Sequence, residues 1–323
     1  MVQVTVGARL HFGFQNLSLA HERLYGGLGV ALESPIVSVE ANPANELRCD
    51  DSRAREYARC ATDILGVPGV NLRVHETLPS HVGLGSGTQL ALTVLAAVAR
   101  AYDRQPMIHE NAPELDRGGR SGVGVSTFER GGFVVDAGHP TERFTTARPR
   151  RGEWSVPPIV ARRPIPPEWR FVIVLPESEP GRSGDEEDES MRTVVERADP
   201  TIANDISVVL LRRALPAIAR DDPVEFGNAV AEIGRLNGAW YADEQGGVYR
   251  PPVGELVTLM EESPAIFGAG QSSWGPAVYG VTTRNRADRA VEVAQLALDS
   301  AGVGGDVLVA RPRNSGASVN GKQ

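Results

Sequence analysis

The first part of the chain alternates between apolar and polar positions over several stretches. Residues 2–14 (VQVTVGARLHFGF) follow the period of two that is typical of a half-buried strand. A glycine turn leads into a second such stretch over 25–41, and a third covers 70–79. Between these two, residues 52–67 have the apolar spacing of an amphipathic helix. We therefore expect the chain to open with a strand-rich unit.

Two glycine-rich turns follow in the middle of the chain. Residues 78–103 (LPSHVGLGSGTQLALTVLAAVARAYD) join a glycine loop to a long apolar run, which predicts a buried helix. Residues 121–138 (SGVGVSTFERGGFVVDAG) predict a second glycine turn, a short helix and a buried strand. Residues 139–170 are rich in proline and arginine, so we expect a domain junction there.

The second half mixes strands and helices without a regular alternation. It predicts strands over 169–176 and 305–312, an acidic loop over 177–190, and helices over 201–220, 223–238 and 286–302. This order favours an α+β fold over a doubly wound parallel sheet. We expect an N-terminal domain over 1–160, a C-terminal domain over 161–313 and a frayed tail over 314–323.

Composition narrows the class of protein. The net charge of −8 argues against a broad nucleic-acid surface but leaves room for a local basic pocket. Lys322 is the one lysine, so any bound anion has to be held by arginines, helix ends or a metal. Two cysteines, Cys49 and Cys60, are too few for a disulfide framework or a four-ligand zinc site. The sequence has no apolar run long enough for a membrane span and no secretory leader, which predicts a cytoplasmic protein.

The glycine loop suits two different purposes. A helix start carries free N–H groups and the positive end of the helix dipole, and glycines let the backbone wrap closely around an anion. The order GLGSGT followed by QLALTVLAAVARAY has this layout, although it is not a Walker A loop. The alternative is a close helix–strand contact that needs small residues. Both readings stay open from the loop alone.

Several motifs together resemble a known family. PSHVGLGSGT is similar to the phosphate loop of the GHMP kinase superfamily, except that Gly87 stands where a second serine is usual. GQSSWGP (270–276) resembles more specifically the β-ribofuranosylaminobenzene 5′-phosphate synthases, a branch of that superfamily. The stretches ARLHFGF…ERLYGGLGVAL, RGGRSGVGVSTFERGGFVVDAG, DEQGGVYRP and GRSGDEEDE resemble the same branch, so the likeness spans roughly residues 5–280.

The resemblance implies both a fold and a reaction. The implied fold has an N-terminal domain like domain 2 of ribosomal protein S5 and a ferredoxin-like C-terminal α+β domain. The implied activity is a C-ribosyl transfer, in which phosphoribosyl diphosphate joins the ring carbon of 4-aminobenzoate or 4-hydroxybenzoate, with loss of CO2 and diphosphate. The pathway implied is tetrahydromethanopterin-type biosynthesis, with Mg²⁺, no organic cofactor, small-molecule substrates and a homodimer.

The resemblance also assigns residues. Arg23, His11 and Arg9 become the candidate catalytic residues. The implied phosphate- and substrate-binding residues are Gly83, Gly85, Ser86, Gly87, Thr88, Gln271, Ser272, Ser273 and Trp274. The metal ligands stay unassigned, and the loop over 181–189 becomes a candidate lid. One position departs from the family pattern, because Asn16 stands where an aspartate is usual and an amide is neither a general base nor a strong metal ligand.

Each candidate also has a structural interpretation. His11 fits either a proton carrier or a strand histidine satisfied by the backbone, and Arg9 fits either a substrate contact or an internal ion pair. Asp136 fits a base, a metal ligand or a turn-stabilising residue. Glu129 fits a Mg²⁺ contact or a surface helix position, and Trp274 fits stacking on an aromatic substrate or core packing.

Two other functions remain open from the sequence. An ATP-dependent small-molecule kinase, for pantoate or a sugar, would use a similar phosphate loop. A ligand-binding paralogue without activity is the second alternative, and Asn16 is the feature that supports it.

Overall fold

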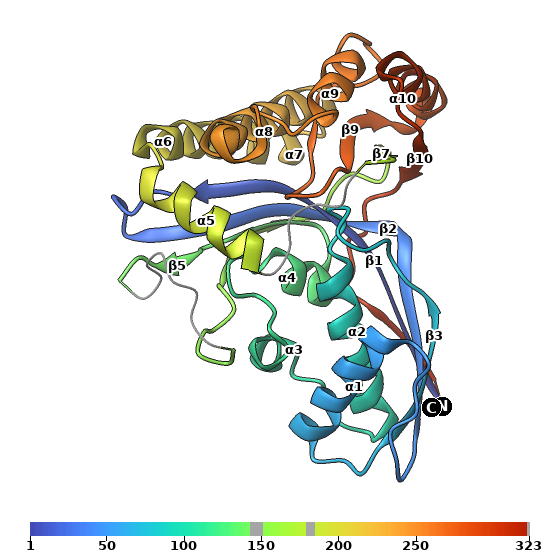
Figure 1. Cartoon of the computed structure of the whole chain (residues 1–323). Coiled ribbons are helices and arrows are strands. Elements are labelled where there is room, and N and C mark those ends of the chain that lie inside the picture. Colours follow the sequence, from blue (N-terminus) through green and yellow to red (C-terminus); the bar gives the residue numbers. More distant parts are fainter. Residues whose placement is uncertain (143–150, 179–184, 322–323) are drawn as a thin grey trace.

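The computed structural model describes residues 1–142, 151–178 and 185–321. Two antiparallel sheets form the framework, and the two longest strands run side by side across the molecule (Figure 1). The first sheet has the order β11-β1-β2-β4-β6, and β3 and β5 also pair with β2. Its strands are β1 (Val2–Asn16), β2 (Arg23–Pro43), β3 (Val70–Glu76), β4 (Phe133–Asp136), β5 (His139–Pro140), β6 (Ile159–Arg163) and β11 (Ser318–Gly321).

A helical layer covers one side of this sheet. It consists of α1 (Ser52–Leu65), α2 (Ser86–Ala101), α3 (Ile108–Asn111), a 3₁₀ turn over Pro113–Leu115 and α4 (Val123–Arg130). Helix α2 is apolar all round and contacts β1, β2, α1 and α4, so every residue from Gln89 to Ala99 is buried. The glycine loop directly precedes this central helix, as the sequence predicts.

The second sheet has the order β10-β7-β9-β8. Its strands are β7 (Trp169–Pro176), β8 (Ala269–Gln271), β9 (Val278–Thr283) and β10 (Gly305–Ala310). The helices of this half are α5 (Asp185–Arg197), α6 (Pro200–Val209), α7 (Leu215–Ala219), α8 (Pro223–Gln245), α9 (Val253–Glu261) and α10 (Ala287–Ala301); a π-helical segment (Leu210–Ala214) joins α6 to α7 and a 3₁₀ turn (Arg284–Arg286) precedes α10. Because both sheets are antiparallel, the α+β prediction is confirmed and a doubly wound parallel sheet is excluded for the described residues.

The two halves share one apolar core. Phe12 of β1 lies 4.9 Å from Tyr279 of β9 and 6.1 Å from Phe226 of α8 between ring centroids. Trp169 of β7 lies 5.0 Å from Phe226 in the same cluster. The crossing between the sheets falls after β6, at residues 164–168, a few residues beyond the predicted boundary at 160.

The C-terminal tail returns to the first half of the chain, and the two termini lie together (Figure 1). Strand β11 pairs with β1 from Val2↔Gly321 to Thr5↔Ser318. The prediction of a frayed tail is therefore wrong for residues 314–321, while 322–323 lie outside the described residues. The tail is held by backbone pairing, which a small polar sequence does not reveal.

The predicted acidic loop over 177–190 is only partly a loop. Helix α5 begins at Asp185, and residues 179–184 lie outside the described part of the chain. The candidate lid over 181–189 is therefore helix from 185 onward. Among the described residues, no helix is long and apolar enough to cross a membrane.

Candidate functional site

The site begins where the glycine loop of the first half interlocks with the turn that follows β8. Ser272 Oγ donates to the carbonyl of Gly83 at 2.8 Å, and the Ala277 N–H donates to Val82 O at 3.0 Å. The glycines make this close approach possible. A Cβ added at Gly83 would lie 2.2 Å from Ser272 O, and one at Gly275 would lie 2.1 Å from the Val82 carbonyl carbon. The close-contact reading is thus correct, although the contact joins two loops rather than a helix and a strand.

The same loop also presents a free helix start. Gly85 is the residue before α2 and adopts a left-handed conformation at φ 81°, which glycine tolerates best. No side chain caps this helix end, so the first N–H groups of α2 point at the space in front of it. That geometry suits an anion. The loop can therefore serve both purposes, a close backbone contact and an anion site.

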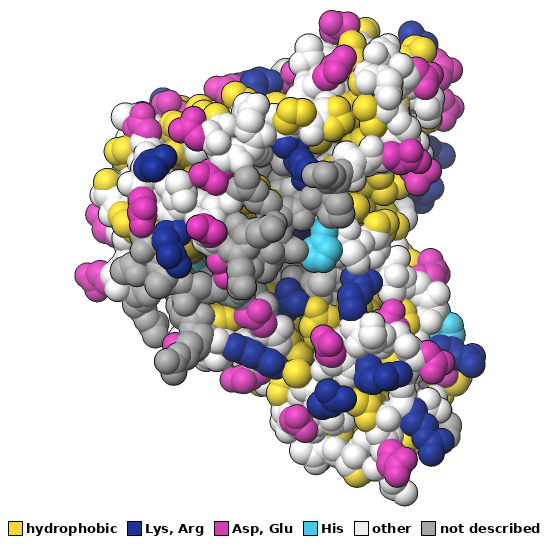
Figure 2. Space-filling model, viewed as in Figure 1, with side chains coloured by type: hydrophobic (Ala, Val, Ile, Leu, Met, Phe, Trp, Pro, Cys, Tyr) yellow, Lys and Arg dark blue, Asp and Glu magenta, His cyan; other side chains and the backbone are white. Residues whose placement is uncertain are grey.

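In front of this helix end lies a wide hollow, which we call the arginine pocket. It encloses about 1490 Å³ of space, part of it open to solvent. It is lined by Arg9, Arg53, Tyr57, His81, Gly83, Gly85, Ser86, Gly87, Thr88, Asp116, Arg117, Gly118, Gly119, Arg120, Ser121, Asp188, Ser273, Trp274 and Gly275. Figure 2 shows basic side chains near the centre of this face, between the two halves of the molecule. A locally basic pocket therefore exists in a chain of net charge −8.

Neighbouring groups hold the guanidinium groups of this pocket in place. Arg9 donates from Nη1 to Gly83 O at 2.6 Å, and Arg117 donates to Tyr57 Oη at 2.5 Å. Arg53 bonds Ser80, and Arg120 forms an ion pair with Asp188 of α5. Sequence reasoning missed Arg53, Arg117 and Arg120. The Arg-Gly-Gly-Arg run over 117–120 was the available signal for Arg117 and Arg120, since it opens one of the stretches that resemble the family.

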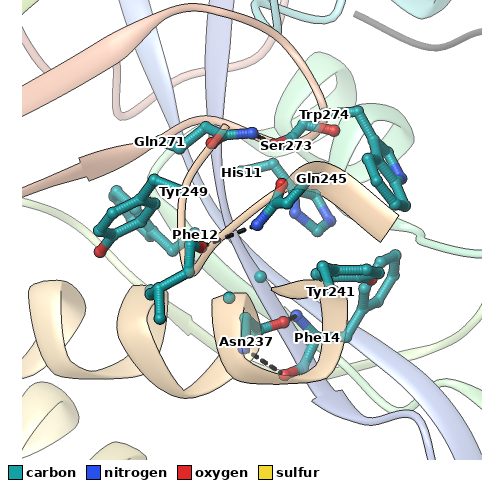
Figure 3. Close-up of a pocket in the computed structure, with 14 residues that line it drawn as sticks. His11, Phe12, Phe14, Asn237, Tyr241, Gln245, Tyr249, Gln271, Ser273 and Trp274 are labelled. Carbon is teal, nitrogen blue, oxygen red and sulfur yellow. Dashed lines mark hydrogen bonds between the residues drawn. The ribbon is translucent and has the colours of Figure 1, made fainter. Parts of the chain in front are cut away.

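A second, smaller hollow lies on the other side of the 270–276 turn, and we call it the aromatic pocket. Its space of about 450 Å³ is partly open to solvent. Its lining residues are His11, Phe12, Gly13, Phe14, Gly234, Asn237, Gly238, Tyr241, Gln245, Val248, Tyr249, Gln271, Ser273 and Trp274 (Figure 3). Ser273 and Trp274 line both hollows, so one short turn separates an anion-type site from an aromatic one.

The aromatic pocket is built from β1 and α8. Asn237 of α8 accepts the Phe14 N–H at 2.7 Å and donates to Phe14 O at 3.0 Å, which clamps the strand to the helix (Figure 3). One turn later on α8, Tyr241 packs edge-on against Trp274, with centroids 4.5 Å apart. Tyr241 and Tyr249 both line the pocket.

Beside the shared wall, hydrogen bonds link three polar side chains, of which His11 and Asp136 are buried while Ser121 is half-buried and lines the arginine pocket. His11 Nε2 lies 3.1 Å from Ser121 Oγ, and Ser121 Oγ lies 3.2 Å from Asp136 Oδ2. Burial, and to a smaller extent the charge of Arg9, lower the pKa of His11 from 6.5 to about 3. Burial raises the pKa of Asp136 from 3.8 to about 6, against hydrogen bonds from three backbone N–H groups and Ser121 that lower it.

The structure brings most of the predicted residues together. The glycine-loop residues and Arg9 line the arginine pocket, and His11 and Gln271 line the aromatic pocket. Ser272 lines neither, but its hydroxyl accepts the His11 backbone N–H at 3.1 Å and fastens the two loops. Arg23 does not reach either pocket. Its guanidinium donates to Ala137 O at 2.5 Å and Gly138 O at 2.7 Å, at the edge formed by β2 and β5.

No group of three or more His, Cys, Asp or Glu side chains within residues 1–142, 151–178 and 185–321 could hold a metal ion. Glu129 lines neither pocket and lies 3.8 Å from His109 Nδ1 at the end of α4. The carboxylates at the arginine pocket are Asp116 and the arginine-paired Asp188.

Comparison with known proteins identifies the superfamily. The family models "GHMP kinases N terminal domain" and "GHMP kinases C terminal" match residues 53–132 and 214–299. The β-ribofuranosylphenol 5′-phosphate synthase of Methanothermobacter thermautotrophicus is 32% identical over 332 residues, covering 97% of each chain. The synthase of the same name from Archaeoglobus fulgidus is 30% identical and covers 88% of this chain and 89% of its own.

Solved structures share the fold. The mevalonate kinase of Methanococcus jannaschii superimposes with a TM-score of 0.67 at 14% sequence identity, covering 97% of this chain and 98% of its own. At that identity the likeness concerns the fold alone, and it confirms the fold expected from the resemblance.

Proposed function

Because the chain belongs to the β-ribofuranosylphenol 5′-phosphate synthases of the GHMP kinase superfamily, and is therefore an enzyme, we propose that it joins phosphoribosyl diphosphate to the ring of a 4-substituted benzoate. The names of the relatives specify a phenol product, so 4-hydroxybenzoate becomes the first candidate acceptor and 4-aminobenzoate the second. This order reverses the one that the sequence motifs suggest.

The observation that carries the proposal is the pair of pockets with one shared wall. The arginine pocket offers helix N–H groups and guanidinium groups to the phosphates of the sugar substrate. The aromatic pocket offers rings to a flat aromatic acid. Ser273 and Trp274 border both, so the anomeric carbon of the sugar and the ring carbon of the acid would meet beside this turn.

The chemistry needs little covalent help from the protein. The bond between the anomeric carbon and diphosphate breaks, and the ring carbon that carries the carboxylate supplies the electron pair for the new C–C bond. The carboxylate then leaves as CO2, and the electrons of its C–C bond restore aromaticity. The arginines and the α2 N–H groups would stabilise the departing diphosphate, and the half-buried rings of Tyr241 and Trp274 would limit the access of water to the sugar cation.

Mg²⁺ fits this proposal as an ion that would bind together with the phosphates of the sugar substrate. Mg²⁺ commonly binds through substrate phosphates and one or two carboxylates, and it would neutralise charge on the leaving diphosphate. The described donor set matches that mode, since Asp116 is a carboxylate at the arginine pocket and no larger acidic cluster is present among the described residues. We place the reaction in tetrahydromethanopterin-type biosynthesis on the strength of the family resemblance.

The test is direct measurement of CO2 and diphosphate released by the purified protein with Mg²⁺ and phosphoribosyl diphosphate. 4-Hydroxybenzoate and 4-aminobenzoate are supplied in parallel, and a third reaction contains ATP with small hydroxy acids. Release of both products with either benzoate supports the proposal. ADP formation would identify a kinase, and ligand binding without turnover would identify a non-catalytic paralogue.

Two variants test the division of labour between the pockets. Arg117→Gln should raise KM for phosphoribosyl diphosphate tenfold or more, because a hydrogen bond to a charged group contributes about 1.5–3 kcal/mol. Tyr241→Ala should raise KM for the benzoate instead, since Tyr241 lines the aromatic pocket and not the arginine pocket. Arg48→Gln, on an exposed side chain, is the control. Equal changes of both KM values in both variants would contradict two separate subsites.

A further inference from the structure

The hydrogen-bonded row of three polar groups links three separate elements to the aromatic pocket, and its middle member, Ser121, is half-buried at the arginine pocket. His11 comes from β1, Ser121 from the turn before α4, and Asp136 from the end of β4. The exposed fraction of the side chain is 5% for His11 and 0% for Asp136. Aspartate side chains are almost never buried this completely unless they are paired, so the burial of Asp136 needs an explanation.

The neighbouring backbone leaves room for the His11–Ser121–Asp136 row and fixes its orientation. A Cβ added at Gly27 of β2 would lie 2.1 Å from Ser121 Oγ and 2.9 Å from Asp136 Oδ2, so only glycine fits there. The Gly122 N–H donates to Asp136 Oδ2 at 2.7 Å, and the Gly138 N–H donates to Oδ1 at 2.8 Å. Asp136 therefore has one fixed orientation, with Oδ2 toward Ser121.

The number of protons available along the His11–Ser121–Asp136 row fixes the tautomer of His11. The Ser121 hydroxyl has one proton, and its oxygen already accepts the Val123 N–H at 3.2 Å. When Asp136 is ionised, Ser121 donates its proton to Asp136, and its oxygen accepts a hydrogen bond from His11 Nε2–H. His11 Nδ1 then carries no proton, and none of the described residues forms a hydrogen bond with it.

We infer that Ser121 and Asp136 are positioning residues, which set the tautomer of His11 and so present its Nδ1 to the aromatic pocket as a hydrogen-bond acceptor. Resting on the proposed function, the group received there is the hydroxyl of 4-hydroxybenzoate. A hydrogen bond from this hydroxyl to Nδ1 increases the electron density of the ring, which makes the ring carbon opposite the hydroxyl a better nucleophile. The hydroxyl keeps its proton, so no proton balance is disturbed.

Protonation of Asp136 reverses every hydrogen bond in the chain. The carboxylic acid donates to Ser121, Ser121 donates to His11 Nε2, and Nδ1 carries the proton instead. The pKa of Asp136, about 6, places this reversal in an accessible range. The pKa of His11, about 3, keeps the ring neutral throughout, so the tautomer changes and the charge does not.

Other ionisable groups lie on the elements that carry or border the three residues. Arg9 and Arg23 lie on β1 and β2, and Arg120 adjoins Ser121 and is paired with Asp188. His139 lies on β5, and Arg162 of β6 donates to the carbonyls of Arg130, Gly131 and Asn314. The arginines stay charged across the range in which Asp136 titrates, so they do not produce the reversal.

The test is ¹⁵N NMR of histidine-labelled protein between pH 5 and 8 without substrate. His11 is identified among the six histidines through His11→Gln. In the wild type we expect the Nε2–H tautomer above pH 6 and the Nδ1–H tautomer below it. Ser121→Ala should abolish the change, whereas Ser126→Ala, which removes another buried hydroxyl of the same region, should retain it.

A kinetic measurement adds a readout that packing alone would not move. In the wild type, kcat/KM for 4-hydroxybenzoate should fall about tenfold for each pH unit below about 6, and in Ser121→Ala this limb should disappear. A wild-type tautomer that stays constant from pH 5 to 8 overturns the inference, and this outcome needs no variant to fold. A tautomer change in a protein without synthase activity would support the inference and reject the proposed function.

Discussion

The departure at Asn16 has a structural explanation. Its side-chain amide donates to Ser18 O at 2.8 Å and to Arg23 O at 2.7 Å, and its Oδ1 accepts the Ser18 N–H at 2.8 Å. All of the side chain is thus engaged in bracing the turn between β1 and β2. Asn16 lines neither pocket, so its presence does not argue for loss of the chemistry.

Asn16→Asp tests this explanation. A carboxylate cannot donate to two carbonyls, so we expect a loss of about 1–3 kcal/mol in the free energy of unfolding at pH 7.5. Asn285→Asp, at an exposed site where the side chain accepts a bond from Thr283, should change stability little. The measurement is urea unfolding together with kcat/KM. Higher activity in Asn16→Asp would show instead that a carboxylate is needed there for catalysis.

At the residue scale, sequence reasoning succeeded where a residue lies inside a distinctive motif. Trp274 and the glycine-loop residues were found because GQSSWGP and GLGSGT are unusual strings. Arg117 and Ser121 were missed as individual residues, since single arginines and serines are common and only the fold brings Ser121 to His11 and Arg117 to the glycine loop. Arg23 is the opposite case. Its motif is distinctive and marked it as a candidate, but its guanidinium donates to backbone carbonyls outside the pockets.

At the scale of elements, the interlock of two loops explains why the chain contains so many glycines around the site. The backbone of residues 82–83 packs against residues 272–275 with no room for side chains between them. The strands and the apolar helix α2 could be predicted from periodicity, because each pattern is local. The interlock could not, because it joins residues about 190 positions apart, as the Ser272–Gly83 bond shows with a separation of 189.

Gly275→Ala is the prediction at this scale. The added Cβ would lie 2.1 Å from a backbone carbon, so the glycine loop has to move. We expect about 1–3 kcal/mol of destabilisation, as for other overpacked sites, and a clear rise in KM for phosphoribosyl diphosphate. Gly302→Ala is the control, because it has φ 65° with open space around it and should cost about 1 kcal/mol without changing KM. An unchanged KM in Gly275→Ala would show that the loop does not bind the sugar substrate.

At the scale of the whole molecule, the two sheets are joined by one shared apolar core. Phe12, Phe226 and Tyr279 belong to a core that spans both halves. The tail adds a second connection. Asn314 Oδ1 accepts the Ile165 N–H at 2.8 Å, and its Nδ2 donates to Ile165 O at 2.8 Å, which fixes the segment that crosses between the sheets.

Asn314→Ala tests whether the tail holds the two halves together. Removing the side chain leaves both polar groups of the Ile165 backbone without these bonds, so we expect a loss of about 1–2 kcal/mol in the free energy of unfolding. Asn320→Ala, at an exposed position of β11, should stay within about 0.5 kcal/mol of the wild type. Guanidinium unfolding followed by circular dichroism and by tryptophan fluorescence should give one coincident transition for all three proteins, because the shared core couples the halves. Equal stability of the two variants would mean that the tail is frayed in solution, as its composition suggests, and separate transitions would mean that the halves fold independently.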